Sequence, residues 1–142
     1  VKDDTSLNRE AIASIVFEDG EMLKKLDDII HPAVKKYILK EIEKSKKEET
    51  EFFFIESALL LEEKYDEICD EMWYIYCEKE VRMERLRHDR GYSDEKIQRM
   101  MANQLPDEEF EARCDFQLYN DEDVAHTYLQ IERKMRTYYE FM

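Results

Sequence analysis

Glycine is scarce in this sequence. Only Gly20 and Gly91 occur among its 142 residues, a very low share for a globular domain of this length. Two glycines that lie 71 positions apart cannot form GxxxxGK[ST], the loop whose backbone amides hold phosphates, because that motif needs its glycines close together. The 142 residues therefore contain no phosphate-binding loop of this type.

Cysteine is also sparse, and its spacing excludes two kinds of site. The three cysteines, Cys69, Cys77 and Cys114, are odd in number and show no CxxC spacing. This pattern predicts reduced thiols in a cytoplasmic protein rather than a disulfide framework. Neither the cysteines nor His88 and His126 have metal-ligand spacing, so we expect no structural zinc and no residue that binds a metal directly.

Long apolar runs and an excess of positive charge are missing as well. No stretch approaches the roughly 18 apolar residues of a membrane span, and no signal-peptide pattern is present. The net charge of −14 gives a surface that repels nucleic-acid backbones and anionic lipids. We therefore expect neither nucleic acid nor membrane as a partner. The length suits one domain or part of a larger one, and the oligomeric state cannot be inferred.

One of the two prolines follows a histidine within a helical pattern. Apolar residues at helical spacing predict helices over 5–17 and 18–31, and a third from Pro32 to about residue 48. Proline disfavours the α conformation in the residue before it and suits the first helical turn. The sequence therefore predicts that one helix ends near His31 and another begins at Pro32. His31 then either caps an interhelix turn or lies beside free helix amides that suit an anionic or polar group.

Short aromatic and β-branched runs follow this helical part. They are EFFFIE at 51–56, EMWYIYC at 71–77 and, more weakly, DFQLYN at 115–120. Such runs, separated by helical stretches, predict buried parallel strands. We expect a loop and a helix after the first run, two helices between the second and third, and a closing helix over 126–142. The predicted fold class is α/β.

Several loose motifs occur in a defined order along these segments. Arg9 and Ile12 precede Val16-Phe17, and His31-Pro32 precedes Val34; the first predicted strand runs into ESALLLE at 56–62; Arg85-Leu86 precedes Arg90-Gly91-Tyr92-Ser93 and Gln104; and Cys114-Asp115 leads through Leu118 to Asn120. In this order and spacing they resemble the motifs of the dephospho-CoA kinases, a family of P-loop kinases. The resemblance covers most of the chain.

The resemblance implies an organisation for the chain. Residues 1–50 would form a helical region that binds the CoA substrate, residues 51–78 and 114–142 the α/β core, and residues 79–113 a helical lid. The family also has an earlier strand and a Walker A loop, whose amides hold the ATP phosphates and whose hydroxyl binds Mg²⁺. We therefore expect an incomplete P-loop sheet, with that strand between the runs at 51–56 and 71–77, and a chain that is a fragment of a kinase.

The implied function is ATP-dependent phosphorylation of the ribose 3′-hydroxyl of dephospho-CoA, the last step of coenzyme A biosynthesis, with ATP and Mg²⁺ as cofactors. We expect the 142 residues alone to be inactive. Two alternatives stay open. One is a non-catalytic helical interaction protein derived from a kinase. The other is a different nucleoside or nucleotide kinase of similar layout.

The resemblance also implies substrate contacts in the first part of the chain. Arg9 and His31 would bind dephospho-CoA. Glu56 would follow a strand at the carboxyl edge of the sheet, where open α/β sheets place their sites, although the family usually has aspartate there. Glu62 is expected to be structural.

A group of basic residues stands out in the acidic chain. Residues 82–99 contain six basic and four acidic residues, a net charge of +2 in a chain of −14. They form either a solvated helix face with i,i+4 pairs or a mobile lid that closes on ATP. The positive charge favours a lid. The resemblance implies that Arg85 and Arg90 are catalytic residues and that Arg85 also binds nucleotide. In many family members the second arginine falls one position earlier, at Asp89.

Two polar residues complete the expected nucleotide site. Asn120 either contacts the adenine of ATP or forms a turn before the closing helix, and the sequence favours neither. Gln104 is a candidate lid contact rather than a catalyst.

Overall fold

The computed structural model describes residues 7–140, except for the side chains at positions 9, 10, 17 and 18. The chain divides into two compact units, Val1–Ser57 and Ala58–Met142, which are described separately. In the described part of the chain, no helix has both the length and the apolar character needed to cross a membrane.

The first unit begins with two capped helices. Helix α1 spans Arg9–Glu18 and helix α2 spans Gly20–Lys47. The side chain of Asn8 accepts a hydrogen bond from the Ala11 backbone amide at 3.1 Å, and Asp19 accepts from the amides of Glu21 and Met22. These short polar side chains satisfy amides that have no partner within the helix, and they fix where each helix starts. The predicted helix over 5–17 is confirmed within the described residues.

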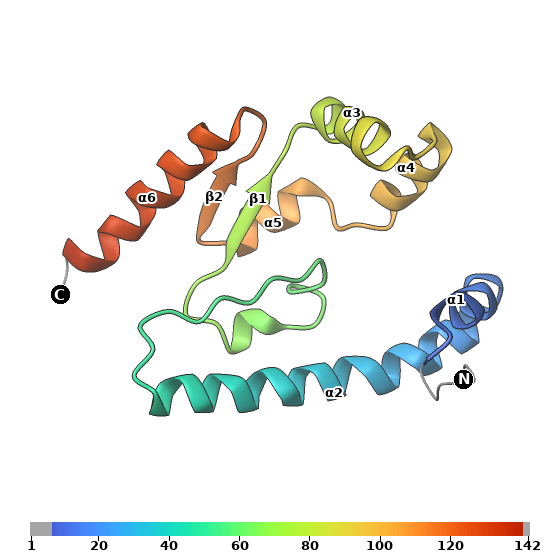
Figure 1. The fold of residues 1–142 in the computed structure, drawn as a ribbon, viewed down its shortest axis with the longest axis horizontal. Helices are drawn as coiled ribbons and strands as arrows, with labels where there is room; N and C mark the ends of the chain where they lie inside the picture. Colours follow the sequence, from blue (N-terminus) through green and yellow to red (C-terminus); the bar gives the residue numbers. More distant parts are fainter. Residues whose placement is uncertain (1–6, 141–142) are drawn as a thin grey trace. The chain divides into compact units, whose positions relative to one another are not determined.

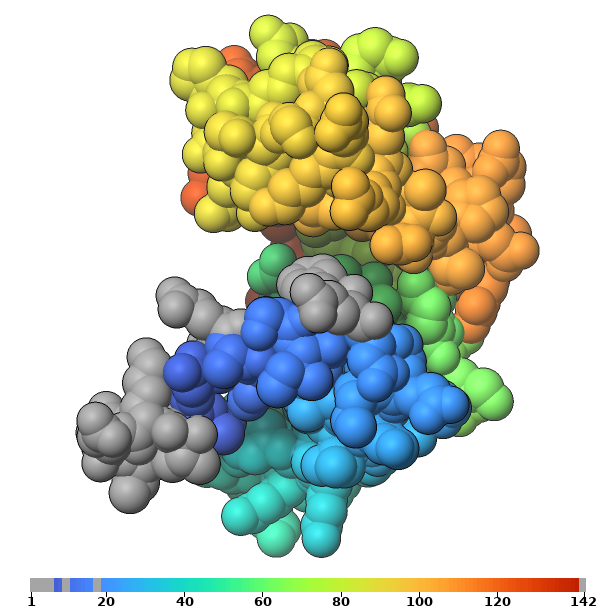
Figure 2. All heavy atoms as spheres, turned by 90° about the vertical axis from the view of Figure 1, so that its right-hand side faces the viewer, coloured from blue at the N-terminus to red at the C-terminus, as the bar shows by residue number. Residues whose placement is uncertain are grey.

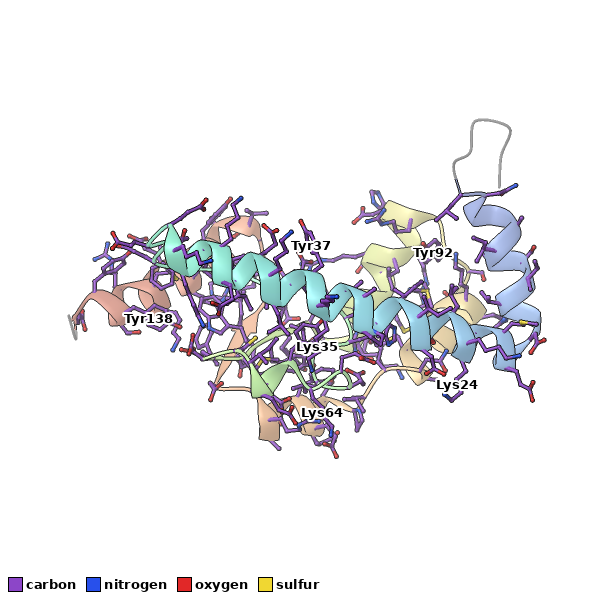
Figure 3. The ribbon with its side chains drawn as sticks, turned by 90° about the horizontal axis from the view of Figure 1, so that it is seen from below. Lys24, Lys35, Tyr37, Lys64, Tyr92 and Tyr138 are labelled. Carbon is purple, nitrogen blue, oxygen red and sulfur yellow. The ribbon has the colours of Figure 1, made fainter. Side chains whose placement is uncertain are left out.

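The predicted break at His31-Pro32 is wrong. Helix α2 continues through Pro32, and Lys24 and Tyr37, which flank the proline, lie along one uninterrupted helix (Figures 1 and 3). Proline removes one hydrogen bond at a cost of about 3 kcal/mol, whereas ending and restarting the helix would leave several amides and carbonyls unpaired at each new end. One lost bond is the smaller loss, and no helix N-terminus exists at Pro32.

The predicted strand at 51–56 is also absent, because residues 52–57 have no regular secondary structure. The rings of Phe52 and Phe54 stack with centroids 6.2 Å apart. A strand is defined by hydrogen bonds to a neighbouring strand, and no described strand lies beside this segment. The composition of the run therefore does not suffice to make it a strand here.

The second unit contains a two-stranded parallel sheet. Strand β1 spans Trp73–Tyr76 and strand β2 spans Phe116–Tyr119, with Trp73 opposite Phe116 and Tyr76 opposite Tyr119. The predictions of strands at 71–77 and 115–120, of parallel pairing and of an α/β fold are confirmed.

Along the chain, the second unit also contains four helices and one short 3₁₀ turn. The turn η1 (Tyr65–Glu67) stands where a helix was expected; α3 (Lys79–Arg90), α4 (Asp94–Ala102) and α5 (Asp107–Arg113) lie between the strands; and α6 (Val124–Glu140) follows β2. The sequence predicts only two helices between the strands, because α5, with 7 residues, is too short to show a clear period. Ser93 caps α4 by accepting from the Lys96 amide.

The buried core of the described residues lies in the second unit. It consists of Leu61, Tyr65, Met72, Tyr74, Ile97 and Leu118. The Tyr74 ring stacks on Phe110 of α5 at 4.8 Å, and Trp73 meets Phe116 edge to face across the strands. Helix α4, in yellow-orange in Figure 2, exposes most of its surface and buries Ile97. Aromatic packing thus supplies much of the contact that holds this small sheet to its helices.

Candidate functional site at the carboxyl ends of the strands

The carboxyl ends of β1 and β2 lie side by side because the strands are parallel. The Asn120 amide donates to the Tyr76 carbonyl at 2.8 Å, and the Glu78 amide donates to the Asp121 carboxylate. These bonds connect the segments that follow the two strands. Open α/β sheets bind their ligands at this edge, so it is the first place to look for a site.

Arg85 reaches this edge from α3. Its guanidinium donates to three successive backbone carbonyls, those of Asn120, Asp121 and Glu122, the last two at 3.2 and 3.0 Å. It also lies 3.7 Å from the Cys77 sulfur. Arg85 is half-buried, and a guanidinium in this position holds the segment after β2 against α3. It does not belong to a solvated helix face.

Asn120 meets Arg85 through its backbone. Its side-chain oxygen accepts from the Thr127 hydroxyl at 3.2 Å, and Asp123 accepts from the His126 amide at 2.8 Å. These contacts organise the turn between β2 and α6. Asn120 thus takes part in the turn before α6, and a contact with adenine stays a prediction.

A tyrosine and an aspartate anchor α5 to the sheet. The Tyr74 hydroxyl donates to Asp107 at 2.6 Å. Burial, followed by the hydrogen bond to the Asp107 carboxylate, raises the pKa of Tyr74 far above its ordinary value. Tyr74 therefore stays protonated at neutral pH and acts as a donor.

The other end of α5 is held by an ion pair. Arg113 bonds to the Asp66 carboxylate at 2.9 Å and to the Leu61 carbonyl at 3.2 Å. Hydrogen bonding to Arg113 lowers the pKa of Asp66. Helix α5 is therefore attached at both ends, and α3 is attached through Arg85. Helix α4 is joined to α3 by the Arg87–Asp94 ion pair and buries Ile97.

Comparison with known proteins decides the family. The sequence model described as dephospho-CoA kinase matches residues 1–126 of the chain. The chain belongs to the dephospho-CoA kinase family.

Several dephospho-CoA kinases are similar in sequence to this chain. The enzyme of Rhodopirellula baltica is 36% identical over 105 residues, which are 71% of this chain and 48% of the relative. That of Aquifex aeolicus is 35% identical over 128 residues, 90% of this chain and 64% of the relative. That of Symbiobacterium thermophilum is 31% identical over 136 residues, 96% of this chain and 57% of the relative. The chain thus spans between about half and two thirds of these relatives.

Solved structures agree with the fold. A crystal structure of a Thermus thermophilus protein matches with a TM-score of 0.74 at 26% identity, over 92% of this chain and 67% of the other. A dephospho-CoA kinase from Campylobacter jejuni matches with a TM-score of 0.71 at 23% identity, over 96% of this chain and 67% of the other. The second likeness, at this low identity, bears on the fold alone.

The other predicted site residues of this dephospho-CoA kinase family member are dispersed. Arg90 is exposed as the last residue of α3, and Gln104 is exposed in the turn after α4, where its amide donates to the Met101 carbonyl. Within the described residues, no hydrogen bond joins either side chain to Arg85 or Asn120. The structure thus brings together two of the four residues predicted for this half of the site.

The predicted substrate residues all fall in the first unit. His31 is half-buried on α2, with its Nε2 3.6 Å from the Asp27 carboxylate, and Glu56 is exposed. The side chain of Arg9 lies outside the described residues. Their roles in binding dephospho-CoA stay predictions, and that of His31 no longer has a helix end to support it.

Sequence reasoning missed three polar residues in and around the sheet. These are Asp121, Tyr74 and Asp107, whose contacts join the segments after the strands and fix α5. Asp121 directly follows the predicted Asn120, so its position was the only available signal. In the residues that the structure describes, no group of three histidine, cysteine, aspartate or glutamate side chains could hold a metal ion.

Proposed function

We propose that the protein represented by this chain is a dephospho-CoA kinase, which transfers the γ-phosphoryl group of ATP to the ribose 3′-hydroxyl of dephospho-CoA. The observation that carries this proposal is the family match over residues 1–126. The pairing of Arg85 with the segment after β2 supports it, because phosphoryl transfer depends on positioning and charge stabilisation. We further propose ATP as the phosphoryl donor and the cytoplasm as the location.

We propose that Mg²⁺ takes part only as an ion bound to ATP. Mg²⁺ binds through one or two carboxylates together with substrate phosphates and water. The described residues offer no cluster of three ligands, and Glu56, the carboxylate predicted at the carboxyl edge of the sheet, is exposed in the first unit. These residues do not fit a resident metal site, so no step of the reaction is derived through the ion.

The chain's own residues would act by holding groups in place. Arg85 fixes the segment 120–122 at the carboxyl edge, where a nucleotide would lie in an open α/β sheet. Arg90 and Gln104, on or beside the lid helices, would approach ATP when α4 moves. Arg9, His31 and Glu56 would contact the acceptor. The division into a substrate region, a core and a lid over 79–113 is part of this proposal.

The test is ADP release by the natural gene product with a panel of acceptors. Dephospho-CoA is expected to stimulate ADP release from Mg-ATP far more than adenosine or nucleoside monophosphates do. Preference for another nucleoside or nucleotide would replace the proposal with a different kinase. No release with any acceptor would favour a non-catalytic interaction protein.

Binding of the acceptor has a separate test at His31. His31→Ala is expected to weaken dephospho-CoA binding about ten- to a hundredfold, the loss of one hydrogen bond to a charged group, while ATP binding is nearly unchanged. Calorimetric titration of both ligands measures this, with the exposed Lys36→Ala as the matched control on α2. Equal losses for both ligands would make His31 structural.

A further inference from the structure

Arg82 lies on α3 with part of its guanidinium buried and unpaired. It stands one turn into the helix, where its backbone amide donates to the Glu78 carbonyl at 2.9 Å, and the residue is half-buried. Its Nε atom is buried and has no hydrogen-bond partner in the described part of the chain. A buried donor without a partner destabilises the fold, and more so when it is charged. Such an atom needs an explanation.

Arg82 lies near the hydroxyl of Tyr74, within β1, and near the thiol of Cys77, which follows β1. Burial raises the pKa of Tyr74 and that of Cys77. The positive charge of Arg82 acts on both groups in the opposite direction. Asp107 acts on the same Tyr74 hydroxyl and Asp121 on the same Cys77 thiol. Both carboxylates already accept hydrogen bonds, Asp107 from Tyr74 at 2.6 Å and Asp121 from the Glu78 amide. Among residues 7–140, no carboxylate forms an ion pair with Arg82.

Arg82 and Arg85 are three positions apart, so both lie on the helix face that is turned toward the strand ends. The Arg85 guanidinium already donates hydrogen bonds to the carbonyls of residues 120–122. Arg82 has no such acceptors. The two arginines therefore differ in what they can still bind, and Arg82 is the one available to a ligand.

We propose that Arg82 is an anion-binding residue at this edge of the sheet and that it takes phosphate oxygens of a diphosphate-containing ligand. A guanidinium presents paired donors that match phosphate oxygens. Partial burial strengthens the attraction, because the effective dielectric constant is lower than in water. The acidic chain, at −14, repels anions elsewhere, so an unpaired cation in a half-buried position marks where an anion is accepted.

The identity of the ligand rests on the proposed function, since ATP and dephospho-CoA both carry a diphosphate group. The anion-binding role itself does not. Arg85 is then a positioning residue, which holds the segment after β2, and Arg82 is the residue that contacts the ligand. The sequence analysis, by contrast, names Arg85 and Arg90 as catalytic residues and gives Arg82 no role.

The test observes the Arg82 Nε–H group directly in the 142-residue chain. Nitrogen-15 spectra of arginine side chains are recorded during titration with pyrophosphate, ATP and dephospho-CoA, and the Arg82 signal is assigned by its loss in Arg82→Lys. We expect a saturable shift of this signal with pyrophosphate. We also expect Arg82→Gln to raise the apparent Kd at least tenfold, and Arg87→Gln, an exposed arginine on the same helix, to leave it unchanged.

The outcomes separate the two proposals. No saturable shift in the unmodified chain overturns the anion-binding role without any variant having to fold. Equal affinity in Arg82→Gln, once circular dichroism shows that this variant is folded, overturns it as well. A shift with pyrophosphate in this chain, together with no kinase activity in the natural gene product, keeps the Arg82 proposal and removes the proposed function. ATP and dephospho-CoA, compared at equal concentration, show which diphosphate the site prefers.

Discussion

The side-chain amide of Gln130 forms two hydrogen bonds with the backbone of Tyr119, one in each direction. Its oxygen accepts from the Tyr119 amide at 3.0 Å, and its nitrogen donates to the Tyr119 carbonyl at 2.8 Å. Tyr119 is the last residue of β2, so Gln130 of α6 takes the place of a neighbouring strand at that position. Open strand edges attract other chains, and this contact both closes part of the edge and fixes α6 beside it.

Gln130→Glu is expected to destabilise the fold more than Gln130→Ala. Glutamate replaces the donor with an acceptor that faces the Tyr119 carbonyl, which should cost about 1–3 kcal/mol. Alanine removes both bonds, but water can replace them because Tyr119 is exposed, so about 1 kcal/mol is expected. Urea unfolding measures both, with the exposed Glu132→Gln as control. Equal stability of all three variants would show that the Gln130 contact does not form.

Glu71 provides a prediction of pH dependence. Its carboxylate accepts from Trp73 and Tyr138 and pairs with Lys134 at 2.7 Å. Burial alone would raise the pKa of Glu71, but the Lys134 ammonium and the two hydrogen bonds together lower it below the ordinary value. A lowered pKa means that the carboxylate stabilises the folded state above the unfolded pKa, about 4.3, and that this stabilisation is lost as pH falls through the folded value.

Glu71→Gln is therefore expected to be less stable than the unmodified chain by about 1–3 kcal/mol at pH 7, and this difference should shrink as the pH falls below 4. Urea unfolding at several pH values measures it. Glu132→Gln, which removes an exposed i,i+4 pair with Arg136, should cost less than about 0.5 kcal/mol. A difference at Glu71 that stays constant down to pH 3 would mean that the pKa is not lowered.

Pro32→Ala is expected to stabilise α2. In a continuous helix the alanine amide can donate to the Asp28 carbonyl, which Pro32 cannot do, and the gain can reach about 3 kcal/mol. Circular dichroism during thermal unfolding measures it, beside Lys36→Ala, where only a few tenths of a kcal/mol are expected. Unchanged or lower helix stability in Pro32→Ala would support two helices that meet at the proline.

Arg85→Ala in the natural gene product is expected to lower kcat far more than it raises KM for dephospho-CoA. Loss of three bonds to the segment 120–122 should misplace the nucleotide side of the site. The effect should be about 10³ or less, since larger values belong to arginines that contact the transferring group. Arg85→Lys should not restore kcat, because one ammonium cannot span three carbonyls. Full recovery with lysine would mean that charge alone is required.

The strands were predictable and the loop geometry was not. Residues 73–76 and 116–119 are runs rich in aromatic residues, and this composition alone indicates strands. Both strands and their parallel pairing therefore followed from the sequence. The run at 51–56 has the same composition, yet a strand also needs a partner, which composition does not supply. The prediction of a helix break at Pro32 was wrong for a related reason. It considered the local preference of proline for the first helical turn, but not the unpaired backbone groups at two new helix ends.

The site was predictable in part. Arg85 and Asn120 were identified from motif spacing and do meet. What each atom contacts was not accessible from the sequence, because it depends on which carbonyls a folded segment turns toward the guanidinium. The same limit applies to Arg82 and Gln130, whose contacts or lack of them arise only from the packing of α3 and α6 against the strands.

The 142 residues alone are expected to show no turnover of ATP with dephospho-CoA above background. They contain no GxxxxGK[ST] sequence, and without its amides and hydroxyl most of the charge stabilisation on the phosphates is missing. A coupled ADP-release assay measures this. Turnover above background would require a phosphate-binding site built from the described residues.

The most direct measurement is product analysis with the natural gene product, ATP and dephospho-CoA. Mass spectrometry and phosphorus NMR should find one new phosphate on the ribose 3′-hydroxyl, with one ADP formed for each product molecule. A phosphate on a different acceptor or position, or ATP consumption without a phosphorylated acceptor, would contradict the assignment of this chain to a functioning dephospho-CoA kinase.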